Sequence, residues 1–152
     1  VDNYAATVEH LQQRHNCRVV LTGGHSETER QYGERLAAVG AVNLMGRSSL
    51  KQLLALIRAA RLVICPDSGP AHIATTVNTP VIALFATSNP DRTGPYLSRD
   101  LVVNRYPDAV RKYLKRGVEE LRWGQRVRDP NAMDLITIAE VSSKIDDFFA
   151  NH

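Results

Sequence analysis

The chain has 152 residues, of which 43% are hydrophobic and 23% are charged, and its net charge at pH 7 is +3. This composition is typical of one globular domain with one substantial core. No apolar run approaches the roughly 18 residues of a membrane-spanning helix, and the opening residues 1–4 do not resemble a signal peptide.

The chain contains two cysteines, Cys17 at the edge of one predicted strand and Cys65 inside another. This placement favours buried thiols in a reducing compartment over a disulfide framework. Neither cysteine has another cysteine or a histidine nearby at the spacing of zinc ligands, so no metal site is predicted.

The first third of the chain alternates predicted helices with predicted strands. Ser26 and Glu29 form the pattern of a capping box, which opens the second helix. The predicted elements are a helix over 4–15, a strand over 18–22, a helix from 26 to about 39 and a strand over 42–44.

A further helix begins at Ser49, with Gln52 completing its capping box. Its leucines and isoleucine recur at the spacing of one helical face, which predicts a single buried stripe. The stripe consists of Leu50, Leu53, Leu54 and Ile57.

The middle and the end of the chain continue the alternation. Buried strands are predicted over 62–65 and 81–85, with a two-turn helix between them, and an edge strand over 101–103. Thr137 and Glu140 form a third capping box, which opens a last helix. The apolar face of that helix consists of Ile138, Val141, Ile145 and Phe148. This order of elements predicts an α/β fold with a parallel sheet.

The strand over 62–65 ends in a polar turn that opens the next helix. Asp67 or Ser68 can cap that helix, Gly69 allows a close backbone approach, and Pro70 suits a first helical turn. Backbone N–H groups would then point outward, where a phosphate can bind. An ordinary capped turn without a ligand is the alternative. The polar loop 86–96 follows the neighbouring strand and is expected at the same edge of the sheet.

These motifs resemble the donor-binding half of the lipopolysaccharide heptosyltransferases, which are GT-B glycosyltransferases that use ADP-heptose. The resemblance rests on Asp67-Ser68-Gly69-Pro70-Ala71-His72-Ile73-Ala74, on residues 79–85 and on residues 89–96. It extends upstream through residues 20–24 and 43–47 and covers about residues 4–103.

The resemblance implies a Rossmann-like parallel sheet flanked by helices, the C-terminal half of a GT-B enzyme. Residues 1–152 would form one nucleotide-sugar-binding domain, a fragment without the acceptor domain. The family's first strand of this half, and a lysine that contacts the donor phosphates, would precede residue 1. The strands over 18–22 and 62–65 would then either close up against each other or keep open edges that invite a partner strand.

The resemblance also implies which residues bind the donor. Asp67 and the turn after it would face the sugar and diphosphate, with backbone N–H groups of Ser68, Gly69, Ala71 and His72 as donors, since Pro70 has none. Glu27 would hold the ribose hydroxyls, although an acid in a first helical turn is favoured without any ligand. The remaining donor-binding residues would be Thr22, Gly23 and Gly24 beside the ribose, Met45 and Gly46 beside the base, and Arg47 near phosphate.

The implied reaction is an inverting transfer of heptose from ADP-heptose to a hydroxyl of the lipopolysaccharide inner core. The catalytic base, an Asp, would come from the missing domain, so the chain alone is expected to be inactive. No metal and no cofactor beyond the donor substrate are expected. The alternatives are a nucleotide-binding or interaction module without transfer, and a GT-B enzyme that uses another nucleotide sugar, such as an epimerase acting on a UDP-sugar.

Other catalytic patterns do not fit. Asp67, Ser68 and His72 lie within one turn and cannot form a hydrolase triad, and no G-x-S-x-G motif is present. P-loop and G-x-G-x-x-G motifs are also absent. Among the histidines, only His72 is placed for function, with helix packing as its alternative. The others considered, His10, His15 and His152, are expected at the surface.

The segment 99–128 is strongly basic, with nine basic residues against the four acids Asp100, Asp108, Glu119 and Glu120. The basic residues are Arg99, Arg105, Arg111, Lys112, Lys115, Arg116, Arg122, Arg126 and Arg128. The excess of five positive charges favours a phosphorylated glycolipid or a membrane surface, and a solvated face without a partner is the alternative. Nucleic acid is not expected, since no stacking platform accompanies the charge.

Residues 122–126, with Trp123 at their centre, are expected to form a docking surface. The resemblance implies a cytoplasmic protein with peripheral contact to the inner membrane through segment 99–128.

Overall fold

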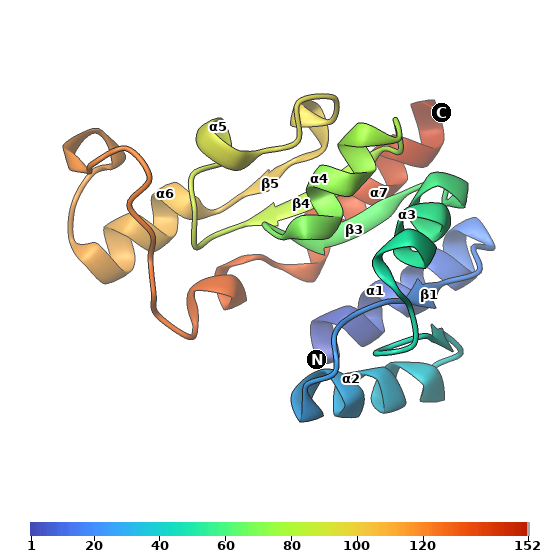
Figure 1. Cartoon of the computed structure of the whole chain (residues 1–152). Helices are drawn as coiled ribbons and strands as arrows, with labels where there is room; N and C mark the ends of the chain where they lie inside the picture. Colours follow the sequence, from blue (N-terminus) through green and yellow to red (C-terminus); the bar gives the residue numbers. More distant parts are fainter. Residues whose placement is uncertain (152) are drawn as a thin grey trace.

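The computed structural model describes residues 1–151, whose strands form two separate parallel sheets (Figure 1). The smaller sheet pairs β1 (Val20–Leu21) with β2 (Val42–Asn43). The larger sheet has the order β3-β4-β5, formed by Val63–Pro66, Val81–Phe85 and Val103–Asn104. Within residues 1–151, no helix is long and apolar enough to cross a membrane.

Strand β4 lies at the centre of three layers because successive side chains of a strand point to opposite faces. Ile82 and Leu84 face a cluster with helices α1 (Asp2–His15) and α7 (Ile138–Asn151). Val81, Ala83 and Phe85 face a second cluster with α3 (Leu50–Ala59) and α4 (Gly69–Thr76). All five residues of β4 are buried, as the continuous apolar run predicts.

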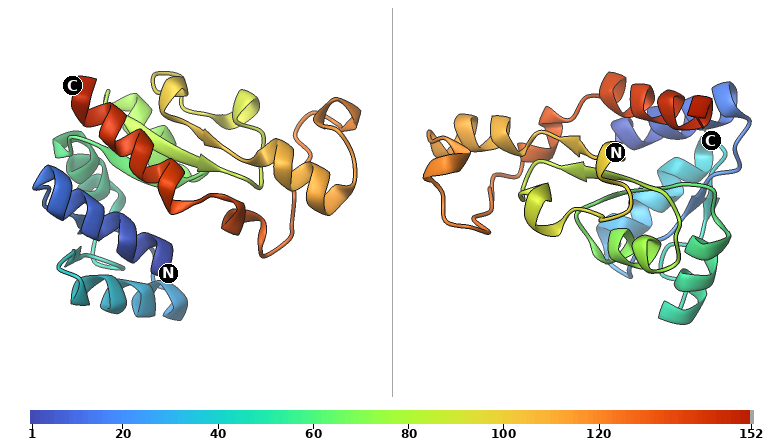
Figure 2. Two further views of the ribbon diagram at one scale, coloured as in Figure 1. Left: turned by 180° about the vertical axis from the view of Figure 1, so that it is seen from behind. Right: turned by 90° about the horizontal axis from the view of Figure 1, so that it is seen from above.

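The smaller sheet has its own modest core. Val8 of α1, Leu36 of α2 (Glu27–Ala38) and Ala41 form a buried cluster, and Leu21 of β1 and the preceding Val19 pack against it. Helix α1 also contributes Leu11 to the cluster under β4. The helix therefore joins the two sheets, and Figure 2 shows it beside α7 from behind and from above.

The segment between β4 and α7 consists of short elements. These are α5 (Pro90–Thr93), a 3-10 turn over Arg99–Leu101, α6 (Tyr106–Ala109) with a π turn over Val110–Leu114, and 3-10 turns over Val118–Glu120 and Ala132–Leu135. A small core around Tyr106, Val110 and Val127 holds the part after β5 together. The Tyr106 hydroxyl donates to the Gln125 carbonyl oxygen (2.7 Å), and the Val127 amide donates to that of Thr87 (2.9 Å).

Local signals predicted the elements well. The capping boxes at Ser26 and Ser49 are both formed, and the Thr137 hydroxyl and the Glu140 carboxylate exchange the corresponding bonds before α7. The α/β fold with parallel strands is confirmed. The apolar face of α7 lies on the chain's own sheet, with Val141, Ile145 and Phe148 buried.

The predicted stripe of α3 is wrong in its first half. Ile57 is 5% exposed, but Leu50 is 72% and Leu54 is 41% exposed. The reason is that α3 meets the larger sheet through Leu53 and Ile57, whereas Leu50 and Leu54 lie outside the cluster at β4. Periodicity shows which residues share a face, but it does not show how far the sheet extends beneath it.

The strands β1 and β3 do not close up against each other. Within residues 1–151, β1 pairs with β2 alone and β3 with β4 alone. Of the two outcomes expected from the sequence, the structure therefore has the one in which edges stay open.

Candidate functional site

Asp67 follows β3 directly and is tied to the loop after β4. Its Oδ2 accepts hydrogen bonds from the Ser88 hydroxyl (2.6 Å) and the Thr93 hydroxyl (3.2 Å). Ser88 is buried, and Asp67 is half-buried. The two polar loops thus meet at the carboxyl edge of the larger sheet, as the parallel arrangement predicts.

The expected side-chain cap of α4 is wrong. Ser68 has an extended backbone (φ −156°, ψ 170°), and its hydroxyl donates back to the Pro66 carbonyl oxygen (3.0 Å). Asp67 points to Ser88 and Thr93 instead of the helix. No side chain from residues 1–151 therefore caps the first turn of α4.

The turn at Gly69 is open to solvent. A Cβ built at Gly69 would meet nothing within 4 Å, and the residue is exposed. Pro70 occupies the first turn of α4 as predicted, and His72 is exposed on the same short helix. The amide of Ala71 already donates to the Ser68 carbonyl oxygen (3.1 Å), which removes it from the expected phosphate donors.

The loop after β4 is held in one conformation. Asn89 caps α5 by accepting from the Asp91 amide (2.9 Å), and the Gly94 amide donates to the Pro90 carbonyl oxygen (2.7 Å). A Cβ at Gly94 would collide with that same Pro90 oxygen, so this turn requires glycine. The loop that carries the Ser88 and Thr93 hydroxyls is therefore held in a fixed conformation.

A second group of predicted residues gathers at the end of the smaller sheet. The Gly46 amide donates to the Gly23 carbonyl oxygen (3.1 Å), and the Met45 sulfur lies against Gly23. Gly46 has a φ of +64°, and a Cβ there would lie 2.8 Å from His25 Nδ1. The turns after β1 and β2 thus contact each other directly.

Glu29, not Glu27, faces this glycine turn. The Glu29 carboxylate accepts from the Gly24 amide (2.9 Å) and the Ser26 hydroxyl (2.6 Å), and these bonds lower its pKa. Glu27 is exposed and bonds to Arg30 and Gln31 on its own helix. The hydrogen bond from Arg30, followed by that from Gln31, lowers the pKa of Glu27 to about 2.

The remaining predicted site residues, Thr22 and Arg47, lie next to these turns. Thr22 is half-buried just after β1, and Arg47 is exposed just after Gly46. The structure thus brings together Gly23, Gly24, Met45 and Gly46 at one sheet, and Asp67 to His72 at the other. The two groups belong to different sheets.

Ser88 and Thr93, whose hydroxyls hold Asp67, were not predicted as site residues from the sequence. Both lie in the predicted polar loop 86–96, so their position after a parallel strand was the available signal. A cavity of about 680 Å³ between that loop and the basic segment was also not predicted. Arg111, Lys115 and Arg116 line it together with Asp91 and Glu119.

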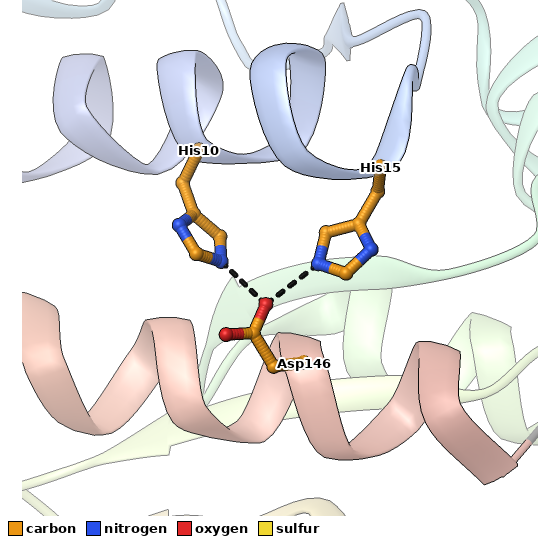
Figure 3. A group of neighbouring side chains, drawn as sticks. All are labelled: His10, His15 and Asp146. Atoms are coloured by element: carbon orange, nitrogen blue, oxygen red, sulfur yellow. Dashed lines mark hydrogen bonds and ion pairs between the residues drawn. The ribbon is translucent and has the colours of Figure 1, made fainter.

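Two histidines expected at the surface lie between helices instead. His10 and His15 of α1 both contact Asp146 of α7, as Figure 3 shows. The expectation failed because Asp146 is far away in the sequence. The third, His152, lies outside the described residues.

Both cysteines are free thiols, as predicted. Cys65 is buried in β3, and burial raises its pKa to about 11. Such a thiol is protonated at neutral pH and acts as an apolar core residue.

Most of the basic side chains in segment 99–128 are exposed. Arg105 is the exception, since its guanidinium pairs with Glu140 (2.7 Å) and Asp108 (2.9 Å) and so joins α6 to α7. The other eight basic residues between 99 and 128 are exposed, and Trp123 is 71% exposed beside them.

Comparison with known proteins gives a consistent result. The model of glycosyltransferase family 9 (heptosyltransferase) matches residues 1–119. The chain is 38% identical over 144 residues to the lipopolysaccharide core heptosyltransferase OpsX of Haemophilus influenzae, covering 93% of this chain and 41% of the relative. It is 35% identical over 92 residues to lipopolysaccharide heptosyltransferase 2 of Escherichia coli, covering 57% of this chain and 26% of the relative.

Two solved structures share the fold. A family 9 glycosyl transferase from Veillonella parvula aligns with a TM-score of 0.68 at 20% identity, covering 99% of this chain and 41% of that one. The E. coli ADP-heptose lps heptosyltransferase II aligns with a TM-score of 0.65 at 23% identity, covering 97% and 41%. The chain spans about two fifths of the length of these proteins.

Proposed function

Because the chain belongs to glycosyltransferase family 9, the heptosyltransferases, we propose that it is the part of such an enzyme that binds the nucleotide-sugar donor. The donor is ADP-heptose, and the full enzyme transfers its heptose, with inversion, to the inner core of lipopolysaccharide. The family match and the relatives support this assignment, since those named above are lipopolysaccharide heptosyltransferases.

The observation that carries the proposal is the edge formed by Asp67, Ser88 and the uncapped start of α4. Both hydroxyl bonds end on Asp67 Oδ2, so Oδ1 is left for a sugar hydroxyl. The space beside Gly69 is open, and the helix N-terminus favours a phosphate there. An anion thus replaces the side-chain cap that α4 lacks.

The nucleoside end of the donor is proposed to lie at the other sheet. Met45 and Gly46 border the base, Thr22 and Gly23 the ribose, and Glu27 accepts from the ribose hydroxyls. A carboxylate suits a diol because it accepts two hydrogen bonds. Glu27 must first leave Arg30, which is inexpensive for an exposed ion pair. Arg47, exposed beside Gly46, faces a phosphate.

The catalytic base is proposed to come from a part of the enzyme outside this chain. Transfer needs an acceptor hydroxyl held in line with the anomeric carbon and a carboxylate to take its proton. We therefore expect the chain alone to bind the nucleotide with high micromolar affinity, about −5 kcal/mol, and to transfer no heptose. Mass spectrometry of an acceptor oligosaccharide checks the second point, and any transferred heptose would contradict it.

Calorimetry with ADP tests the proposed site. Asp67→Asn keeps the shape of the side chain but removes the charge, and we expect binding to weaken several-fold without unfolding the domain. Lys51→Ala, on the exposed side of α3, is the control. Equal ADP binding by the wild type and Asp67→Asn would show that the turn after β3 has only a structural role and does not bind the donor. A thermal-shift comparison of ADP, UDP and GDP separates an ADP-sugar enzyme from one that uses another donor.

The exposed basic side chains are proposed to contact an anionic membrane surface, on the cytoplasmic face of the inner membrane. Eight basic residues and Trp123 of segment 99–128 are exposed, and such side chains suit anionic headgroups. Sedimentation with vesicles tests this. Binding should require anionic lipid, fall at high salt, and weaken in the double variant Arg122→Glu/Arg126→Glu. Equal binding to neutral vesicles would contradict it.

A further inference from the structure

Two imidazoles and one carboxylate converge between α1 and α7 (Figure 3). Nε2 of His10 and Nε2 of His15 each lie 2.7 Å from the same oxygen, Oδ1 of Asp146. The three potential ligand atoms all lie within 4.8 Å of one another. We propose that these residues form a binding site for a divalent transition metal ion of the zinc class.

The chemistry of the three groups selects the metal. Imidazole nitrogen with one carboxylate oxygen suits Zn²⁺, Co²⁺ and Ni²⁺, whereas Mg²⁺ and Ca²⁺ prefer oxygen ligands throughout. In a tetrahedral zinc site with bonds of about 2 Å, ligand atoms lie about 3.3 Å apart. Each imidazole nitrogen therefore needs to lie only about half an ångström farther from Asp146 Oδ1 to reach that separation. The two imidazole nitrogens lie within 4.8 Å of each other.

The ligands are held in place before any ion binds. The His10 and His15 side chains are 21% and 13% exposed, and the His15 ring stacks on Phe149 with centroids 4.4 Å apart. Val141, Ile145 and Phe148 anchor the backbone of α7 on the opposite face. Little conformational entropy remains to be lost on binding, which favours affinity.

Water can reach the proposed metal site, and one arginine side chain competes only weakly with a metal ion for Asp146. Asp146 is 39% exposed, so water can reach the junction and occupy a fourth coordination position. Arg14 Nε lies 3.9 Å from Asp146 Oδ2, but its side chain is 70% exposed and can swing away. In the absence of a metal, both imidazoles donate Nε2–H to Asp146. In its presence, each turns an unprotonated Nε2 to the ion.

The expected role of the ion is a cross-link between the two sheets. Helix α1 packs on the smaller sheet, and α7 packs on the larger one. An ion shared by both helices stabilises their packing.

Zinc-dependent thermal unfolding of the chain without a histidine tag tests the proposal. We expect Zn²⁺ at about a hundredfold excess over its Kd to raise the Tm by about 5 °C or more. The increase should disappear in Asp146→Asn and in His10→Gln, whereas the matched control Asp147→Asn, one residue along and exposed, should keep it. No zinc effect in the wild type, or the same effect in Asp146→Asn, would overturn the proposal.

If these variants do not fold, spectroscopy of the wild-type chain with bound metal tests the same proposal. Co²⁺ at one equivalent should give the intense visible absorption of a four-coordinate ion, and Zn²⁺ should displace it. X-ray absorption at the zinc edge should count two imidazoles. A six-coordinate spectrum, or fewer than two imidazoles, would rule out the site.

Discussion

The two parallel sheets have the same pattern of alternating helices and strands, but they are buried to very different extents. In the larger sheet, β4 has a strand on each side and helices on each face, and Val81 and Phe85 are 0% exposed. In the smaller sheet, β1 has one neighbouring strand, and Val20 is 42% exposed. Strand pairing on both edges and helix cover on both faces therefore determine how much of a strand's apolar surface is removed from water.

The largest expected effect comes from comparing two side-chain truncations, one in each sheet. Phe85→Ala, at the centre of β4, should lower the free energy of unfolding by about 3–5 kcal/mol through a large cavity. Val20→Ala should change it by less than about 0.5 kcal/mol, since Val20 is exposed and belongs to no buried cluster among the described residues. Urea denaturation measures both. Equal losses would mean that the smaller sheet is buried as deeply as the larger one.

A second truncation asks whether the smaller sheet has a core of its own. Leu36 of α2 is 3% exposed and belongs to a small cluster with Val8 and Ala41. Leu36→Ala should lower the free energy of unfolding by about 2 kcal/mol, less than Phe85→Ala, because a small cluster collapses more easily around the space. Hydrogen exchange should then accelerate first in α2 and β2. Uniform acceleration across β4 as well would show that the two sheets unfold as one.

Helix caps give a smaller contrast between the same regions. Ser26→Ala removes the side-chain oxygen that caps α2 and should cost about 1 kcal/mol. Ser68→Ala should cost less, because the Ser68 hydroxyl bonds to Pro66 and leaves the amides of α4 unaltered. Thermal unfolding of both variants measures the difference. A larger loss for Ser68→Ala would mean that its hydroxyl caps α4 in solution.

The smallest expected effect concerns Glu27. Its pKa of about 2 means that its contribution to stability is present above the ordinary value near 4.5 and is lost as the pH falls through about 2. The effect on stability is slight, because the ion pair is exposed and screened by salt. The carboxyl carbon of Glu27, followed by NMR, should titrate near 2 in the wild type. In Arg30→Ala it should move towards 4.5, and an unchanged midpoint would show that Arg30 is not the cause.

The sequence predicted what depends on neighbouring residues. The bounds of β4 and the three capping boxes follow from a continuous apolar run and from partners three residues apart. The meeting of the two polar loops after β3 and β4 followed from strand order. In these cases the responsible interaction lies within one element or between consecutive parallel strands.

The errors share a different cause, which is contact with distant parts of the chain. The solvation of Leu50 and Leu54 depends on where the larger sheet ends beneath α3. Asp67 does not cap α4 because hydroxyls 21 and 26 residues away bind it. His10 and His15 meet a carboxylate more than 130 residues along the chain. No local pattern carries such information.

Helices α1 and α7 lie side by side and run in the same direction, as both views of Figure 2 show. Their peptide dipoles therefore add rather than cancel, and the partial negative charges of both carboxyl ends gather at one end of the molecule. Helix α1 carries Arg14 and His15 in its last turn, whereas α7 has no basic residue there. A positive charge near His15 and Asp146 thus offsets the field of two helices at once, and a protonated imidazole, an arginine or a metal ion can provide it.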